Sequence, residues 1–119
     1  SSELRYLTEI DGFDHVAIVA VSAEDPEVFY GVARFVRLRD RPDTAEAAIV
    51  VADPLQGKGL GRELARRLAD EARERGVRRF TASLLSDNVP AQRLFASLCA
   101  RLEHRRASGL DELTGELAA

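Results

Sequence analysis

The stretch Gln56–Gly61, with the sequence QGKGLG, decides the fold, because it stands between an apolar run at 47–52 and an uninterrupted helix-forming segment at 62–75. The first N–H groups of a helix have no partner within the helix, and the helix dipole adds roughly half a positive charge there. Glycines let an anion approach those N–H groups, because no Cβ stands in the way. The order of strand, glycine loop and helix therefore predicts a phosphate-binding loop.

The spacing of the glycines distinguishes between phosphate-binding motifs. A Walker A loop needs Ser or Thr after its lysine, but Gly59 follows Lys58 here. A dinucleotide-binding fingerprint starting at Gly57 needs glycine at position 62, which is arginine. The pattern that fits is Gln-x-x-Gly-x-Gly, which Gln56, Gly59 and Gly61 form. From these six residues alone, a glycine-rich turn without a ligand remains the alternative.

Composition excludes several classes of protein. The chain has 119 residues, enough for one domain with a real core, and it is 45% hydrophobic and 31% charged. Its net charge of −3 predicts no general attraction to nucleic acid or to an anionic membrane. No apolar run approaches the roughly 20 residues that span a bilayer. The single Cys99 excludes an internal disulfide and is typical of a reducing compartment, so we expect a cytoplasmic protein.

Apolar periodicity predicts one alternating α/β unit. We expect a weak helix at 2–9, strands at 15–21, 29–38, 45–52 and 78–85, helices at 59–75 and from 88 to about 100, and two final strands around a turn at 108–109. Short connections make the early strands antiparallel, and the helix at 59–75 is a crossover between parallel strands. The sequence therefore predicts a mixed sheet.

The Gln-x-x-Gly-x-Gly motif resembles the signature loop of the GNAT superfamily of N-acetyltransferases, which holds the pyrophosphate of acetyl-coenzyme A. Within that family, residues 5–17 and 45–59 look like the bacterial protein lysine acetyltransferases of the Pat type. The resemblance extends over most of the chain. It implies an α/β fold with a mixed, mostly antiparallel sheet, a βαβ cofactor-binding core and no metal.

The segment Asn88–Phe95 matches a second family motif, Asn-x-x-Ala-x-x-x-Tyr. Asn88 matches a residue that contacts the cofactor, and it is equally suited to be a helix N-cap. Phe95 replaces the tyrosine that protonates the departing thiolate, so we expect it to be part of a wall. The cofactor contacts that the resemblance implies are Val50, Val51, Gln56, Gly57, Lys58, Gly59, Leu60, Gly61, Arg62, Asn88 and Phe95.

Acetyl transfer to an amine also needs a base. A lysine with a pKa near 10.4 is about 3.4 units above pH 7, so its deprotonation costs roughly 4.6 kcal/mol. A carboxylate in an apolar setting can accept that proton, and Glu46 lies in an otherwise apolar strand. The resemblance gives a glutamate near this position the role of the base; the alternative is a strand-end residue that points to solvent. His15 is interpreted as a hydrogen-bonded structural residue, with an acceptor-site or proton-carrying role as the alternative.

The resemblance implies transfer of acetyl from acetyl-coenzyme A to a primary amine, with a protein lysine preferred over a small molecule. A catalytically silent acyl-coenzyme A sensor is the alternative. We expect 1–119 to be a single domain that lacks the family's first strand and helix at its N-terminus. The strand beginning near His15 is therefore expected to have an unpaired edge, which would favour a homodimer or pairing with a missing N-terminal or regulatory segment.

Overall fold

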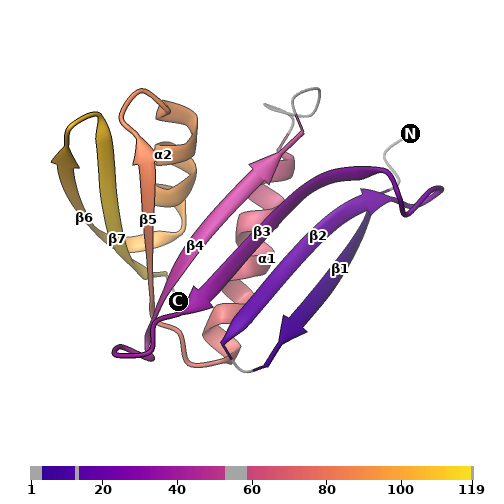
Figure 1. Cartoon of the computed structure of the whole chain (residues 1–119), viewed down its shortest axis with the longest axis horizontal. Helices are drawn as coiled ribbons and strands as arrows, with labels where there is room; N and C mark the ends of the chain where they lie inside the picture. The colour runs from indigo at the N-terminus through magenta and orange to yellow at the C-terminus, as the bar shows by residue number, and fades with distance from the viewer. Residues whose placement is uncertain (1–3, 13, 53–58, 119) are drawn as a thin grey trace.

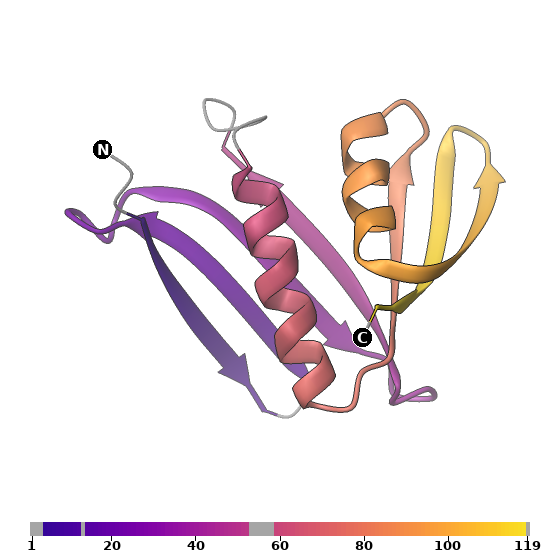
Figure 2. The ribbon, with the colours of Figure 1, turned by 180° about the vertical axis from the view of Figure 1, so that it is seen from behind.

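The computed structural model describes residues 4–12, 14–52 and 59–118. Seven strands form one sheet in the order β1-β2-β3-β4-β5-β7-β6, and both helices lie on the same face of it (Figures 1 and 2). The elements are β1 (Leu4–Asp11), β2 (His15–Ser22), β3 (Phe29–Arg37), β4 (Thr44–Val51), α1 (Leu60–Glu74), β5 (Arg79–Leu85), α2 (Val89–Ser97), β6 (Cys99–Ala107) and β7 (Leu110–Leu117).

The sheet is mixed, as predicted. Only β4 and β5 pair in parallel among the described strands, and α1 is the crossover between them. The other neighbouring strands pair antiparallel. The last hairpin turns at Ser108 and Gly109, which both have positive φ, where the sequence predicted a turn.

The N-terminal segment differs from its prediction, because residues 4–11 form a strand rather than a helix. Leu4 and Tyr6 are half-buried toward α1, while the residues between and beyond them are exposed, which is the alternation of a strand. The guanidinium of Arg67 lies 3.8 Å from the centre of the Tyr6 ring. β1 pairs with β2 along its whole length, so the prediction that the strand at His15 has an unpaired edge is wrong.

The main core lies between α1 and the sheet. Leu60, Leu64 and Leu68 lie on one stripe of the helix, and all three are buried. From the sheet, Phe35 and Phe80 meet it with ring centres 5.8 Å apart. Gly76, with φ of +80°, follows the end of α1, as expected for a helix C-terminus.

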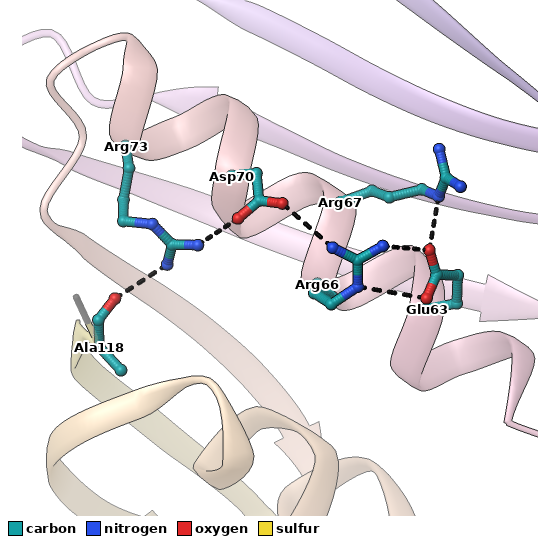
Figure 3. A network of polar contacts seen from close by, with 6 residues as sticks. All are labelled: Glu63, Arg66, Arg67, Asp70, Arg73 and Ala118. Atoms are coloured by element: carbon teal, nitrogen blue, oxygen red, sulfur yellow. Dashed lines mark hydrogen bonds and ion pairs between the residues drawn. The ribbon is translucent and has the colours of Figure 1, made fainter.

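The outer face of α1 carries a ladder of five charged side chains, which Figure 3 shows together with Ala118. Glu63 pairs with Arg66 and with Arg67. The Nε of Arg67 donates a hydrogen bond to the Glu63 carboxylate at 2.7 Å. Asp70 then pairs with Arg66 and with Arg73. Arg73 also donates to the backbone carbonyl of Ala118 at 2.9 Å, so the ladder connects α1 to the C-terminal segment.

Candidate functional site

A cleft opens where β4 and β5 separate. The two strands pair at only three positions, Thr44 with Arg79, Ala45 with Phe80 and Glu46 with Thr81. Beyond the last pair, they diverge into the V that is visible in Figure 1. Among the described residues, the edge of β4 from residue 47 to 50 therefore faces a gap instead of a neighbouring strand.

The walls of this cleft come from both strands and both helices, and they enclose about 260 Å³. Most of the lining is aliphatic or aromatic, so the cleft suits a slender, largely apolar ligand. The lining residues are Ala47, Ala48, Ile49, Val51, Gly61, Leu68, Phe80, Ala82, Leu84, Asn88, Pro90, Ala91, Leu94, Phe95 and Leu98.

The N-terminus of α1 lies at the open end of the V. Its N-cap, Gly59, has φ of +87°, and no side chain among the described residues caps the first turn. A Cβ at Gly61 would lie 3.4 Å from Leu94 and 3.6 Å from Val51, so glycine keeps the passage between the two helices open. These features suit an anion, because the first-turn N–H groups carry partial positive charge. The predicted contacts Gln56, Gly57 and Lys58 lie outside the described residues.

Glu46 lies at the closed end of the V, on the last pair between the strands. Its side chain is exposed, on the face of the sheet opposite the helices, beside Val36 and Thr81. The expectation of an apolar surrounding for this carboxylate is therefore wrong. Side chains along a strand point alternately to the two faces of the sheet, so the apolar residues directly before and after Glu46 point toward the helices.

The other predicted cofactor contacts fall into two groups. Val51, Gly61, Asn88 and Phe95 line the cleft. Val50 is 59% exposed on the other face of β4, Leu60 is buried in the core and Arg62 is exposed, so their side chains do not line it.

Asn88 and Phe95 support the helix as well as the cleft wall. Asn88 caps α2, because its Oδ1 accepts a hydrogen bond from the N–H of Ala91 at 3.2 Å. Phe95 is 7% exposed and is the buried residue of α2. The N-cap role of Asn88 is therefore confirmed, and its contact with the cofactor stays a prediction, made for a residue that lines the cleft.

His15 lies on the same face as Glu46, in one lateral row with Asp11 and Val36. Its Nε2 is buried and has no hydrogen-bond partner among the described residues, so the predicted structural hydrogen bond is absent at this atom. One strand separates it from Glu46, and neighbouring strands are about 4.8 Å apart, so the two residues are roughly 10 Å from each other along the row.

Sequence reasoning missed most of the apolar wall. Ala47 and Ile49 on β4 and Ala82 and Leu84 on β5 face the cleft. Their alternation is visible in the sequence, but it does not reveal that the two strands separate. No described helix is long and apolar enough to cross a membrane. The described residues also contain no cluster of three or more His, Cys, Asp or Glu that could hold a metal ion.

Comparison with known proteins gives consistent matches. A sequence model of the Acetyltransferase (GNAT) family matches residues 2–100. The acetyltransferase Pat of Mycolicibacterium smegmatis is 38% identical over 98 residues, which are 82% of this chain and 29% of that protein. The chain therefore spans less than a third of that relative.

Solved structures agree with the sequence matches. The GNAT domain of Pat from S. lividans has a TM-score of 0.74 at 30% identity, covering 91% of this chain and 64% of that chain. A cAMP-binding acyltransferase from Mycobacterium smegmatis has a TM-score of 0.78 at 28% identity, covering 93% of this chain and 34% of that chain.

Proposed function

Because this chain belongs to the Acetyltransferase (GNAT) family, we propose that it transfers the acetyl group of acetyl-coenzyme A to a primary amine, and that this amine is a lysine side chain of a protein. GNAT acetyltransferases use acetyl-coenzyme A as the acyl donor. Two of the similar proteins are Pat acetyltransferases, which supports a protein lysine over a small amine as the acceptor.

The observation that carries this proposal is the V between β4 and β5, with the N-terminus of α1 at its open end and a carboxylate at its closed end. From Glu46 to Val51 the strand rises about 17 Å, at about 3.3 Å per residue. A donor with its pyrophosphate at α1 would extend its slender arm along β4, and its thioester would arrive near Glu46. The apolar lining and the open space at Gly61 fit that arm.

The position of Glu46 supports direct attack by the amine. The donor occupies the helix side of the sheet, so the acceptor approaches from the exposed face, where the carboxylate lies. Glu46 takes the proton of the amine, directly or through a water molecule, as the nitrogen bonds to the thioester carbon. The C–S bond breaks, and the electron pair leaves with sulfur. A thiol with a pKa near 8.5 makes a fairly good leaving group, which is consistent with Phe95 having no proton to donate.

Phe95 also supports a second candidate function, a binding module that holds acyl-coenzyme A without turnover. Phe95 is an apolar residue of the cleft wall, and it stands where the Asn-x-x-Ala-x-x-x-Tyr motif has the tyrosine that protonates the departing thiolate. The two candidates share the donor cleft and differ only in whether an acceptor amine reacts.

The test is the variant Glu46→Gln, which keeps the shape of the side chain but cannot accept the proton. We expect turnover at pH 7 with lysine-containing peptides to fall about 10²–10⁴-fold, as is typical for loss of a general base, with unchanged affinity for acetyl-coenzyme A in calorimetry. The deficit should shrink as the pH rises toward the pKa of the amine. The matched control is Glu9→Gln, which changes an exposed glutamate on a different strand, β1, and should keep normal turnover.

Near-normal turnover by Glu46→Gln would exclude the glutamate as the base. If the wild-type chain binds acetyl-coenzyme A but acetylates no peptide, free lysine or small amine, the binding module is the better description. Turnover with small amines alone would exclude a protein acceptor.

A further inference from the structure

Asp111 is a carboxylate on β7 with no solvent exposure. It lies on the helix side of the sheet, on the same face of β7 as the core residue Leu113. A buried carboxylate is costly unless hydrogen bonds or positive charges satisfy both of its oxygens. The partners of Asp111 therefore show what this charge is holding together.

Those partners come from three separate segments of the chain. Ser86, in the turn after β5, donates its hydroxyl to Oδ1 at 2.6 Å. Gln92, on α2, donates its amide to Oδ2 at 3.1 Å. From β6, His104 Nε2 lies 2.7 Å from Oδ2 and Arg106 Nε lies 3.6 Å from Oδ1. One side chain thus joins the turn, the helix and the last hairpin.

Gln92 is the link from this cluster into α2. Besides Asp111, its amide reaches the backbone carbonyls of Leu85 at 3.2 Å and Ser86 at 3.3 Å. The side chain therefore fastens the first turns of the helix to the end of β5, while Asp111 holds that side chain in place.

Within the part of the chain that the structure describes, the same helix has few buried contacts. α2 is nine residues long, and Phe95 is its buried residue. Its inner face, with Pro90, Ala91 and Leu94, lines the cleft. A short helix packed through one buried aromatic residue depends on additional contacts for its exact position.

We propose that Asp111 is a positioning residue, which sets the width of the donor cleft by holding α2 through Gln92; this rests on the proposed function, because it assigns the cleft to acetyl-coenzyme A. Hydrogen bonds to an ionised oxygen are stronger than those between neutral groups, which suits a contact that must fix a helix. The carboxylate touches neither donor nor acceptor.

The decisive variant is Gln92→Leu, which removes the amide but keeps a side chain of similar size. We expect the Kd and KM for acetyl-coenzyme A to rise about 5- to 20-fold with little change in kcat, because the loss falls on the cleft wall rather than on the reacting groups. In the free protein, hydrogen exchange of the α2 amides should become faster, while that of α1 is unchanged. Asp111→Asn should raise the Kd and KM and speed exchange in α2 by a larger factor, because an NH2 donor replaces one of the two acceptor oxygens.

Two controls separate positioning from general stability. Arg93→Ala changes an exposed residue of α2 that has no hydrogen bond or ion pair within the described residues, and it should leave affinity and exchange unchanged. Val16→Ala weakens the core under α1, and it should lower the melting temperature without changing the affinity. A merely structural role for Gln92 predicts that its variant behaves like Val16→Ala, so unchanged affinity and exchange in Gln92→Leu would overturn the proposal.

The proposal and the proposed function fail in different ways. If the wild-type chain does not bind acetyl-coenzyme A, the proposed function fails, and the exchange of α2 still decides whether the cluster holds the helix. If the wild-type chain binds but Gln92→Leu binds equally well, only the positioning role is excluded.

Discussion

The two helices line the same cleft, but they are held in different ways. α1 has 15 residues and buries six of them against the sheet. α2 has nine residues and buries one, and its Gln92 side chain bonds a carboxylate on β7 and two backbone carbonyls at the end of β5. One wall of the cleft thus belongs to the hydrophobic core, and the other is positioned by hydrogen bonds. The comparison shows that the fold of the domain and the width of its cleft depend on different interactions.

Local stability should follow the same division. Regions with few buried apolar contacts open at lower free-energy cost than the core. We therefore expect α2 to open without unfolding the sheet, whereas α1 opens only when the domain unfolds.

The largest effect should come from Leu64→Ala, which removes a fully buried side chain on α1. Loss of transfer free energy and the cavity left behind cost about 2–5 kcal/mol for such a change. The matched change on α2, Leu94→Ala, should cost less, because that side chain is only half-buried beside the cleft. Urea denaturation of both variants measures the difference in the free energy of unfolding. Equal losses would remove the distinction between the two walls.

Acidification should have a smaller, more local effect, in which α2 loosens before α1. The hydroxyl of Ser86, followed by His104 and Arg106, lowers the pKa of Asp111 from its ordinary value of 3.8. The hydrogen bond from Arg66, followed by that from Arg67, lowers the pKa of Glu63 from 4.5. A carboxylate with a lowered folded-state pKa stabilises the fold above its ordinary value, and this contribution disappears as the pH falls through the folded-state value.

Protonation of Asp111 removes its charge and turns one acceptor oxygen into an O–H donor, which weakens the contact with α2, whereas protonation of Glu63 weakens only pairs on the surface of α1. We therefore expect the protection factors of the α2 amides to fall first, below about pH 4. Hydrogen exchange at a series of pH values, corrected for the intrinsic rate, provides the measurement. Simultaneous loss of protection in both helices would show that Asp111 has no separate role in holding α2.

The smallest effect should come from Glu63→Gln, which breaks the first step of the ladder in Figure 3. Exposed pairs of this kind contribute about 0.3–0.5 kcal/mol each, because solvent screens them and both side chains lose freedom. Comparison of the variant with wild type in low salt and in 1 M salt should give a small difference that salt removes. A loss well above 1 kcal/mol would mean that the ladder, and not only the core, fixes α1.

Much of the fold could be predicted from local patterns. The uninterrupted helix-forming segment at 62–75 placed α1, and the glycine loop before it marked where the helix begins. Asn88 marked the beginning of α2 in the same way. These features are encoded by neighbouring residues, so no knowledge of the tertiary structure was needed.

The misses depend on contacts between distant segments. Leu4, Leu7 and Ile10 fit a helical spacing, yet pairing with β2 makes the segment a strand. Glu46 lies in an apolar sequence, but the environment of its side chain depends on which face of the sheet the helices cover. Nothing near Asp111 in sequence distinguishes it from the exposed Glu112, and only its shared face with Leu113 hints at burial.

The short pairing between β4 and β5 also has a mechanical consequence. The sheet consists of two parts, one with β1, β2, β3 and β4 and the other with β5, β7 and β6. Three residue pairs between β4 and β5 join the two parts, whereas β3 and β4 share seven pairs. A force that pulls the two parts of the sheet apart therefore has the fewest backbone hydrogen bonds to break between β4 and β5. The two parts of the sheet can therefore turn about this short pairing, and a ligand bound in the cleft would resist that motion by contacting both parts.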